Sequence, residues 1–587
     1  MITLGIYNLG VDPSAAIIQN GNAIAYVEEE RLIRYKHASN LFPINAIAQV
    51  FKQTKLDWDQ IDNIAIPWQC AKYDDGTMEK HYDSINTRYD INHKNDIAYE
   101  KAKLAEYKSE NQKSIILKQL RRVYGNIQFP EILFVNHHLA HACTTFFTSG
   151  ISESIVLTLD GSGEEVTISI WEGKNNRLEL LKEVKTPVSL GWFYSAITEY
   201  LGFTAYGDEW QVMGLSAYGK KSAIYKKAKM RLDAVIWYDQ TGGVDCNPHY
   251  ISLGNKTFSN FCSDSFATLM GRSPRASDAE ITQWHKDIAL AAQNHLEEII
   301  LEVSKYWAIK TGNHNLCLAG GVAMNVKMNG ALFESDWIQK MYVYPIASDS
   351  GTSIGAGMAL YYNLEGNLQN QPLGHVYLGN KYSDREIEVI LMRCQLKFFK
   401  PENLEGYVAQ QIADNKVIGW FQLGMEGGQR ALGARSILAN PLNIESKNTV
   451  NRIIKQRQIW RPFCPSMLQD DVSKYFVLGE KIKKNLKNGA FSFMTMTLTA
   501  NDLAKREIPA VIHEDGTSRI QIVSEHPNER YYKLLTELKE LTGTGTVLNT
   551  SFNVKGDPIV CSPVDAIRTF YATGIDLLVI GNCILLK

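Results

Sequence analysis

The clearest chemistry in this sequence lies in a short histidine-rich segment, V-N-H-H-L-A-H-A, which begins at Val135. His137 and His141 are four residues apart, so on a helix their imidazoles share one face. Two imidazoles at this spacing can bind one metal ion, whereas His138 points elsewhere and is expected to be structural. Because such pairs also occur on ordinary helix surfaces, the metal interpretation needs further ligands.

Two aspartates offer those further ligands. Asp160 follows a predicted strand and opens the segment D-G-S-G, and Asp349 follows another strand and precedes S-G-T. Carboxylates at the strand ends of an α/β fold face the ligand-binding crevice. Two neutral nitrogens with two carboxylates suit a borderline divalent ion such as iron(II), zinc or manganese. We therefore predict a metal site formed by His137, His141, Asp160 and Asp349.

Two glycine-rich segments are candidates for nucleotide binding. In the first, backbone N–H groups of a predicted turn could hold an anion; it consists of Gly161, Ser162 and Gly163. The second joins a predicted strand to a helix N-terminus, where phosphate also binds; it contains Gly320, Gly321 and Asn325. A tight turn explains either segment equally well, so neither segment alone indicates a nucleotide site. Their order along the chain is the more specific signal.

Cations gather in the last third of the sequence. Arg430 and Arg435 lie near glycines, and Lys455 and Arg457 lie in the segment I-K-Q-R-Q-I-W-R-P-F. Arginine forks bind phosphate in a bidentate manner. The alternative is a solvated basic surface, but the interleaved Gly, Trp, Pro and Phe argue against it.

A further candidate follows a predicted strand near the C-terminus. In the segment L-N-T-S-F-N, Ser551 and Asn553 offer a hydroxyl and an amide. They could bind phosphate or ribose, or form a plain turn.

The predicted elements that position these residues fall into two α/β parts. A chain of 587 residues is too long for one hydrophobic core. The first part, 1–365, opens with a β-meander and contains a charged, mostly helical insertion at 70–125, whose charges are expected to form a solvated surface. A linker rich in Asn, Gln, Gly and Pro, 366–384, precedes the second part, 385–587.

Composition narrows the class of protein. Hydrophobic residues make up 45% and charged residues 21% of the chain, and the formal net charge is -2. A nucleic-acid partner would normally require a basic excess, so none is expected. The 9 cysteines are scattered without a CxxC, which favours free thiols. We find no signal peptide and no apolar run that could span a membrane, and expect a cytoplasmic enzyme.

Together these motifs identify a family. The chain resembles the O-carbamoyltransferases that include the nodulation-factor, cephamycin and nebramycin enzymes. The resemblance covers almost the whole chain, in VEEERLIRYKH, NHHLAHA, LTLDGSG, VMGLSAYG, LAGGVAMN, SDSGTSIGAG, RALGARSILANP, IKQRQIWRPFCPSML and NTSFNVKGDPIV.

The resemblance implies an α/β fold in two domains. The N-terminal domain would be TsaD-like, with the actin/sugar-kinase fold, and the C-terminal domain YrdC-like. Carbamoyl phosphate and Mg²⁺-ATP would give carbamoyl-adenylate in the second, and the first would transfer the carbamoyl group to a small-molecule hydroxyl. The family's metal ligands carry over onto the four residues named above, with Fe²⁺ favoured. Its anion contacts carry over onto Arg430, Arg435, Lys455, Arg457, Ser551 and Asn553, and a homodimer is expected.

The sequence departs from the family at the acceptor site. Val11-Asp12 stands where the family has His-Asp, and valine cannot move a proton. Asp12 or His37, or an amine on the acceptor itself, would then serve as the base. Trp460, where phenylalanine is common, and the segment Gly427-Gly428-Gln429 also differ from the family pattern.

Two other functions remain open from the sequence. One is a fusion resembling a tRNA threonylcarbamoyl-transferase, which would need a basic face. The other is a non-catalytic actin-like ATPase module, in which the arginine cluster and the paired ligands would have no role.

Overall fold

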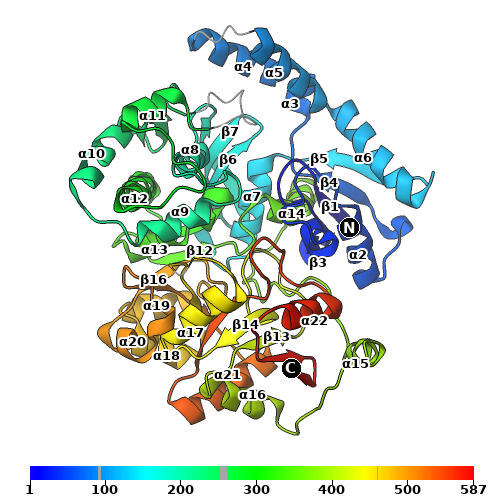
Figure 1. The fold of residues 1–587 in the computed structure, drawn as a ribbon. Coiled ribbons are helices and arrows are strands. Elements are labelled where there is room, and N and C mark those ends of the chain that lie inside the picture. The colour runs from blue at the N-terminus through cyan, green and yellow to red at the C-terminus, as the bar shows by residue number, and fades with distance from the viewer. Residues whose placement is uncertain (90–93, 252–260, 459) are drawn as a thin grey trace. The chain divides into compact units, whose positions relative to one another are not determined.

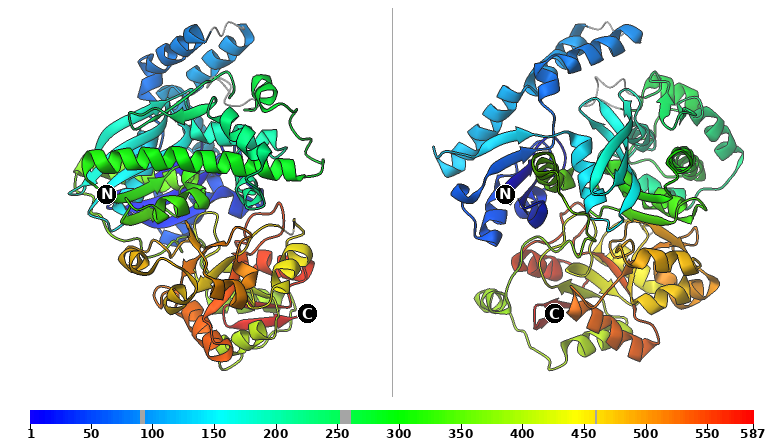
Figure 2. Two further views of the ribbon diagram at one scale, coloured as in Figure 1. Left: turned by 90° about the vertical axis from the view of Figure 1, so that its left-hand side faces the viewer. Right: turned by 180° about the vertical axis from the view of Figure 1, so that it is seen from behind.

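A computed structural model describes residues 1–89, 94–251, 261–458 and 460–587 (Figures 1 and 2). The chain divides into two compact units, each described by itself below. Unit 1 comprises residues 1–24 and 40–371, and unit 2 comprises residues 25–39 and 372–587. The later division lies inside the segment 366–384 that the sequence analysis took as a linker.

Residues 25–39 belong to unit 2, although the sequence analysis placed them in the first domain. Two arginines of this segment explain the difference, because their guanidinium groups donate to backbone carbonyls of unit 2. Arg31 donates to Gly428 at 2.8 Å. Arg34 donates to Pro558 at 2.7 Å and to Ile559 at 2.6 Å. A sequence read in order gives no sign of these distant acceptors.

Two five-stranded sheets with the same topology lie in unit 1, except that residues 25–28, the end of one edge strand, belong to unit 2. In sequence order each has three antiparallel strands, and two later strands continue the sheet in parallel beside the first of them. The first sheet has the order β3-β2-β1-β4-β5 and the second β8-β7-β6-β11-β12. This duplication confirms the predicted actin/sugar-kinase-like fold of the N-terminal part. The strands are β1 (Ile2–Tyr7), β2 (Ser14–Gln19), β3 (Asn22–Glu28), β4 (Asn63–Ile66), β5 (Glu131–Phe134), β6 (Glu153–Gly163), β7 (Val166–Lys174), β8 (Arg177–Lys185), β11 (Asn315–Ala319) and β12 (Lys340–Val343).

Two buried helices lie between these sheets. Helix α14 (Thr352–Glu365) packs on β1 and β2, helix α7 (His137–Phe147) packs on β6 and β11, and the two helices pack on each other. Small residues allow the close approach. A Cβ atom on Gly355 would lie 2.4 Å from the carbonyl oxygen of Ala140, and one on Gly5 only 1.8 Å from that of Ser353.

The remaining helices of unit 1 cover the outer faces. The longest is α12 (Gln283–Thr311), which begins where Thr282 and His285 form a capping box. The others include α2 (Ile44–Thr54), α8 (Leu190–Tyr200), α9 (Glu209–Ser216), α10 (Ala223–Leu232), α11 (Asp264–Met270) and α13 (Val326–Glu334), and a short hairpin joins β9 (Ile236–Tyr238) to β10 (Val244–Cys246).

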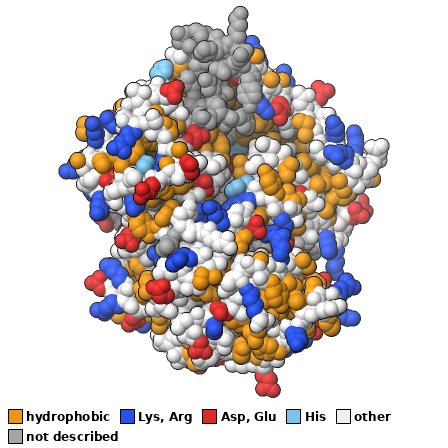
Figure 3. Space-filling view, in the orientation of Figure 1, with side chains coloured by type: hydrophobic (Ala, Val, Ile, Leu, Met, Phe, Trp, Pro, Cys, Tyr) orange, Lys and Arg blue, Asp and Glu red, His pale blue; other side chains and the backbone are white. Residues whose placement is uncertain are grey.

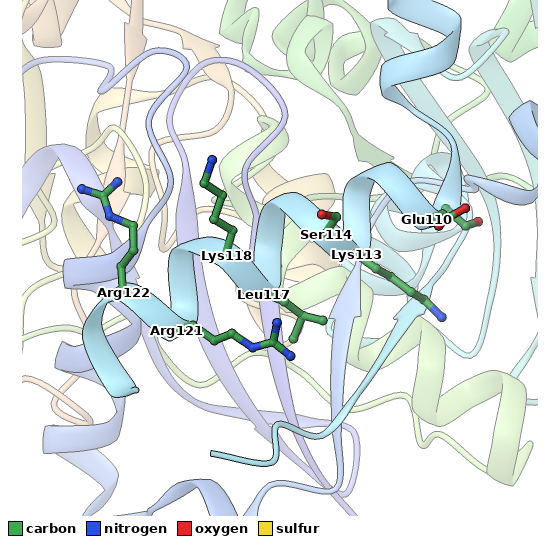
Figure 4. Close-up of a pocket in the computed structure, with 8 residues that line it drawn as sticks. Glu110, Lys113, Ser114, Leu117, Lys118, Arg121 and Arg122 are labelled. Carbon is green, nitrogen blue, oxygen red and sulfur yellow. The ribbon is translucent and has the colours of Figure 1, made fainter. Parts of the chain in front are cut away.

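The segment 70–125 carries four helices, of which α4 and α5 extend beyond the sheets (Figure 1). They are α3 (Ala71–Asp74), α4 (Thr77–Arg88), α5 (Lys94–Glu106) and α6 (Ser109–Tyr124), and residues 90–93 lie outside the described part. The inner face of α6 buries Ile116 and Leu120. Its outer face is basic and lines a hollow along this single helix (Figure 4), with Lys113, Lys118, Arg121 and Arg122.

Unit 2 is an α/β unit around a seven-stranded mixed sheet, in agreement with the predicted class. Its order is β18-β15-β19-β14-β13-β20-β21. Helices α16 (Leu404–Ala413) and α21 (Glu529–Thr542) pack their apolar faces on it, around the buried Trp420 and Tyr531. The strands are β13 (Ile418–Phe421), β14 (Arg435–Ala439), β15 (Cys464–Met467), β18 (Gln521–Ile522), β19 (Thr546–Ser551), β20 (Leu577–Ile580) and β21 (Cys583–Leu586).

Smaller elements complete unit 2. They are α1 (Glu29–Ile33), α15 (Asp384–Arg393), α17 (Glu445–Thr449), α18 (Gln469–Tyr475), α19 (Gly479–Leu486), α20 (Asp502–Glu507) and α22 (Pro563–Ala572), with the hairpin of β16 (Thr497–Thr499) and β17 (Thr517–Arg519).

Charges of both signs are interspersed on the face that Figure 3 shows. This agrees with nearly equal numbers of basic and acidic residues, 61 and 63, in the sequence. Within the part of the chain that the structure describes, no helix is both long and apolar enough to cross a membrane.

The close packing of α14 on β1 gives a stability prediction. We expect Gly5→Ala to lower the free energy of unfolding by about 1–3 kcal/mol, because the new methyl group meets the carbonyl of Ser353. Gly374→Ala is the control, since a Cβ atom there meets nothing within 4 Å. Urea unfolding followed by circular dichroism would measure both variants, and equal stability of the two would contradict the packing argument.

Candidate functional site

The four predicted metal ligands come together in unit 1. Nε2 of His137 and Nε2 of His141 each lie 3.1 Å from Oδ2 of Asp160 and 3.6 Å from Oδ1 of Asp349. Ligands bound at about 2.0–2.2 Å to one ion in tetrahedral or octahedral geometry lie roughly 3–3.6 Å apart. The donor set therefore fits a divalent metal ion, as the sequence analysis predicted for these residues.

Neighbouring groups hold three of the four ligands in a binding orientation. Nδ1 of His137 lies 3.2 Å from the carbonyl oxygen of Pro67, which favours a proton on Nδ1 and leaves Nε2 free for a metal. Oδ1 of Asp160 accepts from two backbone N–H groups, those of Gly161 at 2.8 Å and Gly321 at 3.2 Å. Tyr7 donates its O–H to Oδ2 of Asp349 at 2.7 Å. One oxygen of each carboxylate therefore faces the imidazoles.

The charges of the ligand set are mutually compensating. Burial opposes ionisation of Asp160, but the two imidazoles hold the pKa of its carboxyl well below the usual range. Burial would likewise lower the pKa of His137, yet the two carboxylates raise it well above its usual value. A divalent cation can replace the protons that otherwise balance these carboxylates.

His138 has the structural role predicted for it. Its Nδ1 lies 2.5 Å from Oγ1 of Thr158 and its Nε2 lies 2.9 Å from the carbonyl oxygen of Val166. Burial, with His137 nearby, lowers its pKa to about 3. The ring is therefore neutral and fixes α7 against the second sheet.

The glycine-rich segments differ from their predicted form. The chain does not turn at Asp160: β6 continues through Ser162 to Gly163, with a register shift after Leu159. The N–H groups of Gly161 and Gly321 hold Asp160 rather than standing open to an anion. Phosphate contact by these segments stays a prediction.

Three further predicted positions have structural contacts. A Cβ atom on Gly163 would lie 2.2 Å from the ring of His137. Gly320 has a φ of +93° and leads into the loop that follows β11. Asn325 caps α13 through Met328 and exchanges two hydrogen bonds with Gln293, each of 2.9 Å. Gly163 therefore leaves room for the ring of His137.

The sequence analysis missed Glu164, which anchors the first turn of α7. This buried carboxylate lies in the turn between β6 and β7 and accepts from the backbone N–H groups of Gln69 at 2.5 Å and His137 at 3.3 Å. Burial raises its pKa. Its proximity to the histidines depends on the bulged hairpin, for which the local sequence gave no signal.

The predicted cations come together at one end of the sheet in unit 2. Strands β14 and β15 both run antiparallel to β19, so their beginnings lie beside its end. Arg430 precedes β14, the segment 455–461 precedes β15, and Ser551 ends β19. A π-helical turn, Val450–Ile454, leads into the segment with Lys455.

These cations are mutually close and lack carboxylate partners. Burial, with Arg519 nearby, lowers the pKa of Arg430 to about 9. Burial, with Arg461 and Arg519 nearby, also lowers the pKa of Arg457 to about 9. Among the described residues, none of Arg430, Lys455, Arg457 and Arg519 forms a salt bridge with an Asp or Glu. The group, here called the cation cluster, therefore suits a polyanion such as a triphosphate.

Lys455 joins the other predicted contacts of this end. Its Nζ donates to Oδ1 of Asn553 at 2.6 Å, to Oγ of Ser551 at 3.1 Å and to the carbonyl oxygen of Ser551. Burial, together with Arg457, Lys36 and Arg461, lowers its pKa well below the usual value. The sequence analysis named Lys455, Ser551 and Asn553 separately, and the structure brings them together.

Arg435 has a different environment from the one predicted. Its guanidinium is fully buried and donates to the carbonyl oxygens of Gln422 at 2.5 Å and Asn380 at 2.9 Å. It also stacks on Phe421, at 3.6 Å from the ring centroid. Because these contacts occupy the guanidinium of Arg435 with backbone carbonyls, Arg435 does not belong to the cation cluster. Arg519, which lies in no recognisable sequence motif, belongs to the cation cluster instead.

The two candidate bases belong to different units. Asp12 lies between β1 and β2 with a φ of +59°. His37 follows α1 with a φ of +65°, and its backbone N–H donates to Oε2 of Glu30 at 2.7 Å. The role of either residue as a base stays a prediction.

Comparison with protein families assigns both parts of the sequence. The model described as carbamoyltransferase N-terminus matches residues 3–358, and the model described as carbamoyltransferase C-terminus matches residues 409–587. The chain belongs to the carbamoyltransferase family. This confirms the resemblance found in the motifs, and the protein is a transferase of carbamoyl groups.

Curated relatives agree with this assignment. The carbamoyltransferase is 32% identical to nodulation protein NolNO of Sinorhizobium fredii, over 98% of this chain and 79% of the relative. It is 33% identical to nodulation protein NolO of Bradyrhizobium diazoefficiens, over 77% of this chain and 79% of the relative. An uncharacterized protein of Synechocystis sp. is 33% identical over 100% of this chain and 96% of its own length.

Solved structures are more distantly similar. Full-length HypF in a phosphate- and nucleotide-bound form matches 63% of the carbamoyltransferase with a TM-score of 0.33 and 12% identity. A hexokinase of the ROK family from Thermus thermophilus matches 62% with a TM-score of 0.27. Because these TM-scores are low, the fold of unit 1 is assigned from its duplicated strand order and not from these matches.

The ligand geometry predicts which histidine binds metal. We expect His141→Ala to weaken the binding of Mn²⁺ or Zn²⁺ by more than about 100-fold, beyond the roughly 10- to 100-fold typical for groups that only orient a ligand. His138→Gln is the control on the same helix. Isothermal titration of the metal-stripped protein would measure both variants, and equal losses would contradict the assignment. Affinity should also fall as the pH falls, since protons compete for the same atoms.

The cation cluster predicts a stabilisation by polyanions. ATP at 100 times its dissociation constant should stabilise the protein by about 2.7 kcal/mol, which raises the melting temperature. Arg519→Ala should abolish this rise without lowering the melting temperature of the free protein, because it removes a repulsion.

Arg568→Ala is the matched control for this variant, since Arg568 is exposed and pairs with Asp557 at 3.5 Å. Differential scanning fluorimetry would show the shifts. An Arg519→Ala protein that still responds fully to ATP would contradict the assignment of a polyanion site.

Proposed function

We propose that this carbamoyltransferase is ATP-dependent and works in two steps. At the cation cluster of unit 2, carbamoyl phosphate would lose its phosphate to water. A carbamate oxygen would then bond to the α-phosphorus of ATP as pyrophosphate leaves. In unit 1, the oxygen of an acceptor hydroxyl would bond to the carbamoyl carbon, with AMP as the leaving group.

The observation that carries the proposal is the cation cluster. Clustered guanidinium groups that are partly buried and lack carboxylate partners are costly unless an anion compensates them. Arg430, Arg457 and Arg519 would bind phosphate oxygens and stabilise the negative charge that develops as pyrophosphate departs, typically a large catalytic term. Lys455, held by Ser551 and Asn553, would add a positioned ammonium group.

The ligand set of unit 1 would hold a divalent metal ion through His137, His141, Asp160 and Asp349. Such an ion supplies Lewis-acid polarisation of an oxygen bound to it. Gly161 and Gly321 keep Asp160 oriented, and Tyr7 does the same for Asp349. Asp12 or His37 would take the proton from the acceptor hydroxyl. We further propose iron(II) as the ion and a small molecule as the acceptor.

An assay without acceptor tests the first step. Purified protein would be incubated with Mg²⁺-ATP and carbamoyl phosphate, and pyrophosphate and AMP would be followed. Arg430→Ala should lower the carbamoyl-phosphate-dependent release of pyrophosphate by about 100-fold or more, as expected for the loss of one charge-stabilising donor. His137→Ala should retain this release, because its role lies in the second step.

Arg568→Ala again serves as the control and should release pyrophosphate at the wild-type rate. Failure of the folded wild-type protein to release pyrophosphate in response to carbamoyl phosphate would reject the adenylation step. Equal losses in Arg430→Ala and His137→Ala would reject its assignment to unit 2.

A further inference from the structure

The loop that joins β13 to β14, residues 422–434, carries Arg430 of the cation cluster and is here called the arginine loop. The part of the loop that follows Arg430 is held by a buried carboxylate. One oxygen of Glu426 accepts from three backbone N–H groups, those of Leu432 at 2.8 Å, Ala434 at 3.3 Å and Arg435 at 3.1 Å. This part of the loop is therefore fixed from within the C-terminal stretch of the chain.

The part of the loop that precedes Arg430 is held by side chains of residues 25–39. Nη2 of Arg31 donates to the carbonyl oxygen of Gly428 at 2.8 Å, and the N–H of Gly428 donates to Oε1 of Glu28 at 3.2 Å. Nε of Arg31 donates to Oε2 of Glu28 at 2.6 Å, which closes the set. One ion pair therefore binds both backbone polar groups of Gly428, whose φ of +88° favours glycine.

This ion pair is buried and charged. The side chains of Arg31 and Glu28 are 3% and 4% exposed, and Nε of Arg31 also lies 3.3 Å from Oε1 of Glu30. Burial alone would lower the pKa of Arg31, but Glu28 and Glu30 raise it above its usual value. Hydrogen bonds between charged groups are short and strong, and the planar guanidinium gives them a fixed geometry. The pair therefore leaves Gly428 little freedom to move.

We propose that Arg31 and Glu28 are positioning residues for the adenylation step, which they serve by fixing the place of Arg430. This inference rests on the proposed function, because it concerns the first of the two proposed steps. Arg430 follows Gly428 by two residues, which span at most about 7 Å, so a shift of Gly428 is passed on to Arg430. A misplacement of about 1 Å can lower a rate about 100-fold. Adenylation therefore depends on residues far outside the matched C-terminal region, 409–587.

The competing explanation is that Arg31 only fastens residues 25–39 to the rest of unit 2. Other contacts already do so on both sides of Arg31. The backbone N–H of Tyr26 donates to the carbonyl oxygen of Leu378 at 3.1 Å. The guanidinium of Arg34 donates to the carbonyl oxygens of Pro558 and Ile559, at 2.7 and 2.6 Å. A conservative change at Arg31 therefore leaves the segment attached and loosens only its hold on the arginine loop.

A double-mutant cycle on the full chain tests the inference. Arg31→Lys keeps the positive charge but loses the fork that binds Glu28 and Gly428 at the same time. Carbamoyl-phosphate-dependent release of pyrophosphate at limiting Mg²⁺-ATP would be measured in the wild type, Arg31→Lys, Arg430→Ala and the double variant. We expect Arg31→Lys to lower the rate roughly 10- to 100-fold in the wild type. In Arg430→Ala it should cost less than about twofold, because the group that it positions is absent.

Two further variants complete the cycle. Arg34→Lys is the matched control, because Arg34 lies in the same segment but donates to carbonyls outside the arginine loop. Any loss that it causes should be equal in the wild type and in Arg430→Ala. Glu28→Gln removes the other half of the ion pair at constant size and should behave like Arg31→Lys. Circular dichroism would verify that each variant is folded at the assay temperature, and Glu28→Gln decides the question if Arg31→Lys is unfolded.

The outcomes separate this inference from the proposed function. Wild-type activity of a folded Arg31→Lys protein, or an equal loss with and without Arg430, would show that the pair does not act through Arg430. Unfolding of both Arg31→Lys and Glu28→Gln would also overturn the inference, since the pair would then serve the fold as a whole. If the wild type releases no pyrophosphate in response to carbamoyl phosphate, the proposed function is wrong. The same cycle, measured on ATP affinity by isothermal titration, then decides whether Arg31 positions Arg430.

Discussion

The close approach of α7 and α14 is the constraint on which the metal ligands of unit 1 depend. Ala140 lies between His137 and His141 on α7, and Gly355 of α14 comes so near that a Cβ atom would meet the carbonyl of Ala140. Asp349 directly precedes α14. Ligands from two distant parts of the chain therefore fall within 3.6 Å of each other only because small residues line this contact.

The two candidate sites differ in their charges, which are compensated in unit 1 and uncompensated in unit 2. In unit 1, carboxylates and imidazoles compensate one another, and backbone N–H groups fix the orientation of Asp160. In unit 2, burial and then the neighbouring cations lower the pKa values of Lys455 and Arg457. The first arrangement is stable before a metal binds, whereas the second gains its stability from an anion. Both arrangements are consistent with the proposed function.

Sequence patterns predicted the parts that local periodicity and strong motifs define. The helix that carries His137 and His141 lies where it was expected, and so do the four metal ligands. The sequence did not predict Arg519 or Glu164, because each reaches its site through tertiary contacts that leave no motif. It also misjudged Arg435, since nothing local distinguishes an arginine that binds phosphate from one that binds buried carbonyls.

The chain passes between its units three times, after residues 24, 39 and 371. Residues 25–39 leave the ribosome more than three hundred residues before the rest of unit 2. Until that part is synthesised, Arg31 and Arg34 therefore lack their carbonyl acceptors. A cut at the later boundary would yield a C-terminal fragment that lacks an internal piece of its own structure. Recombination at a single point cannot exchange either unit whole, because each unit is made of two separate stretches of the chain.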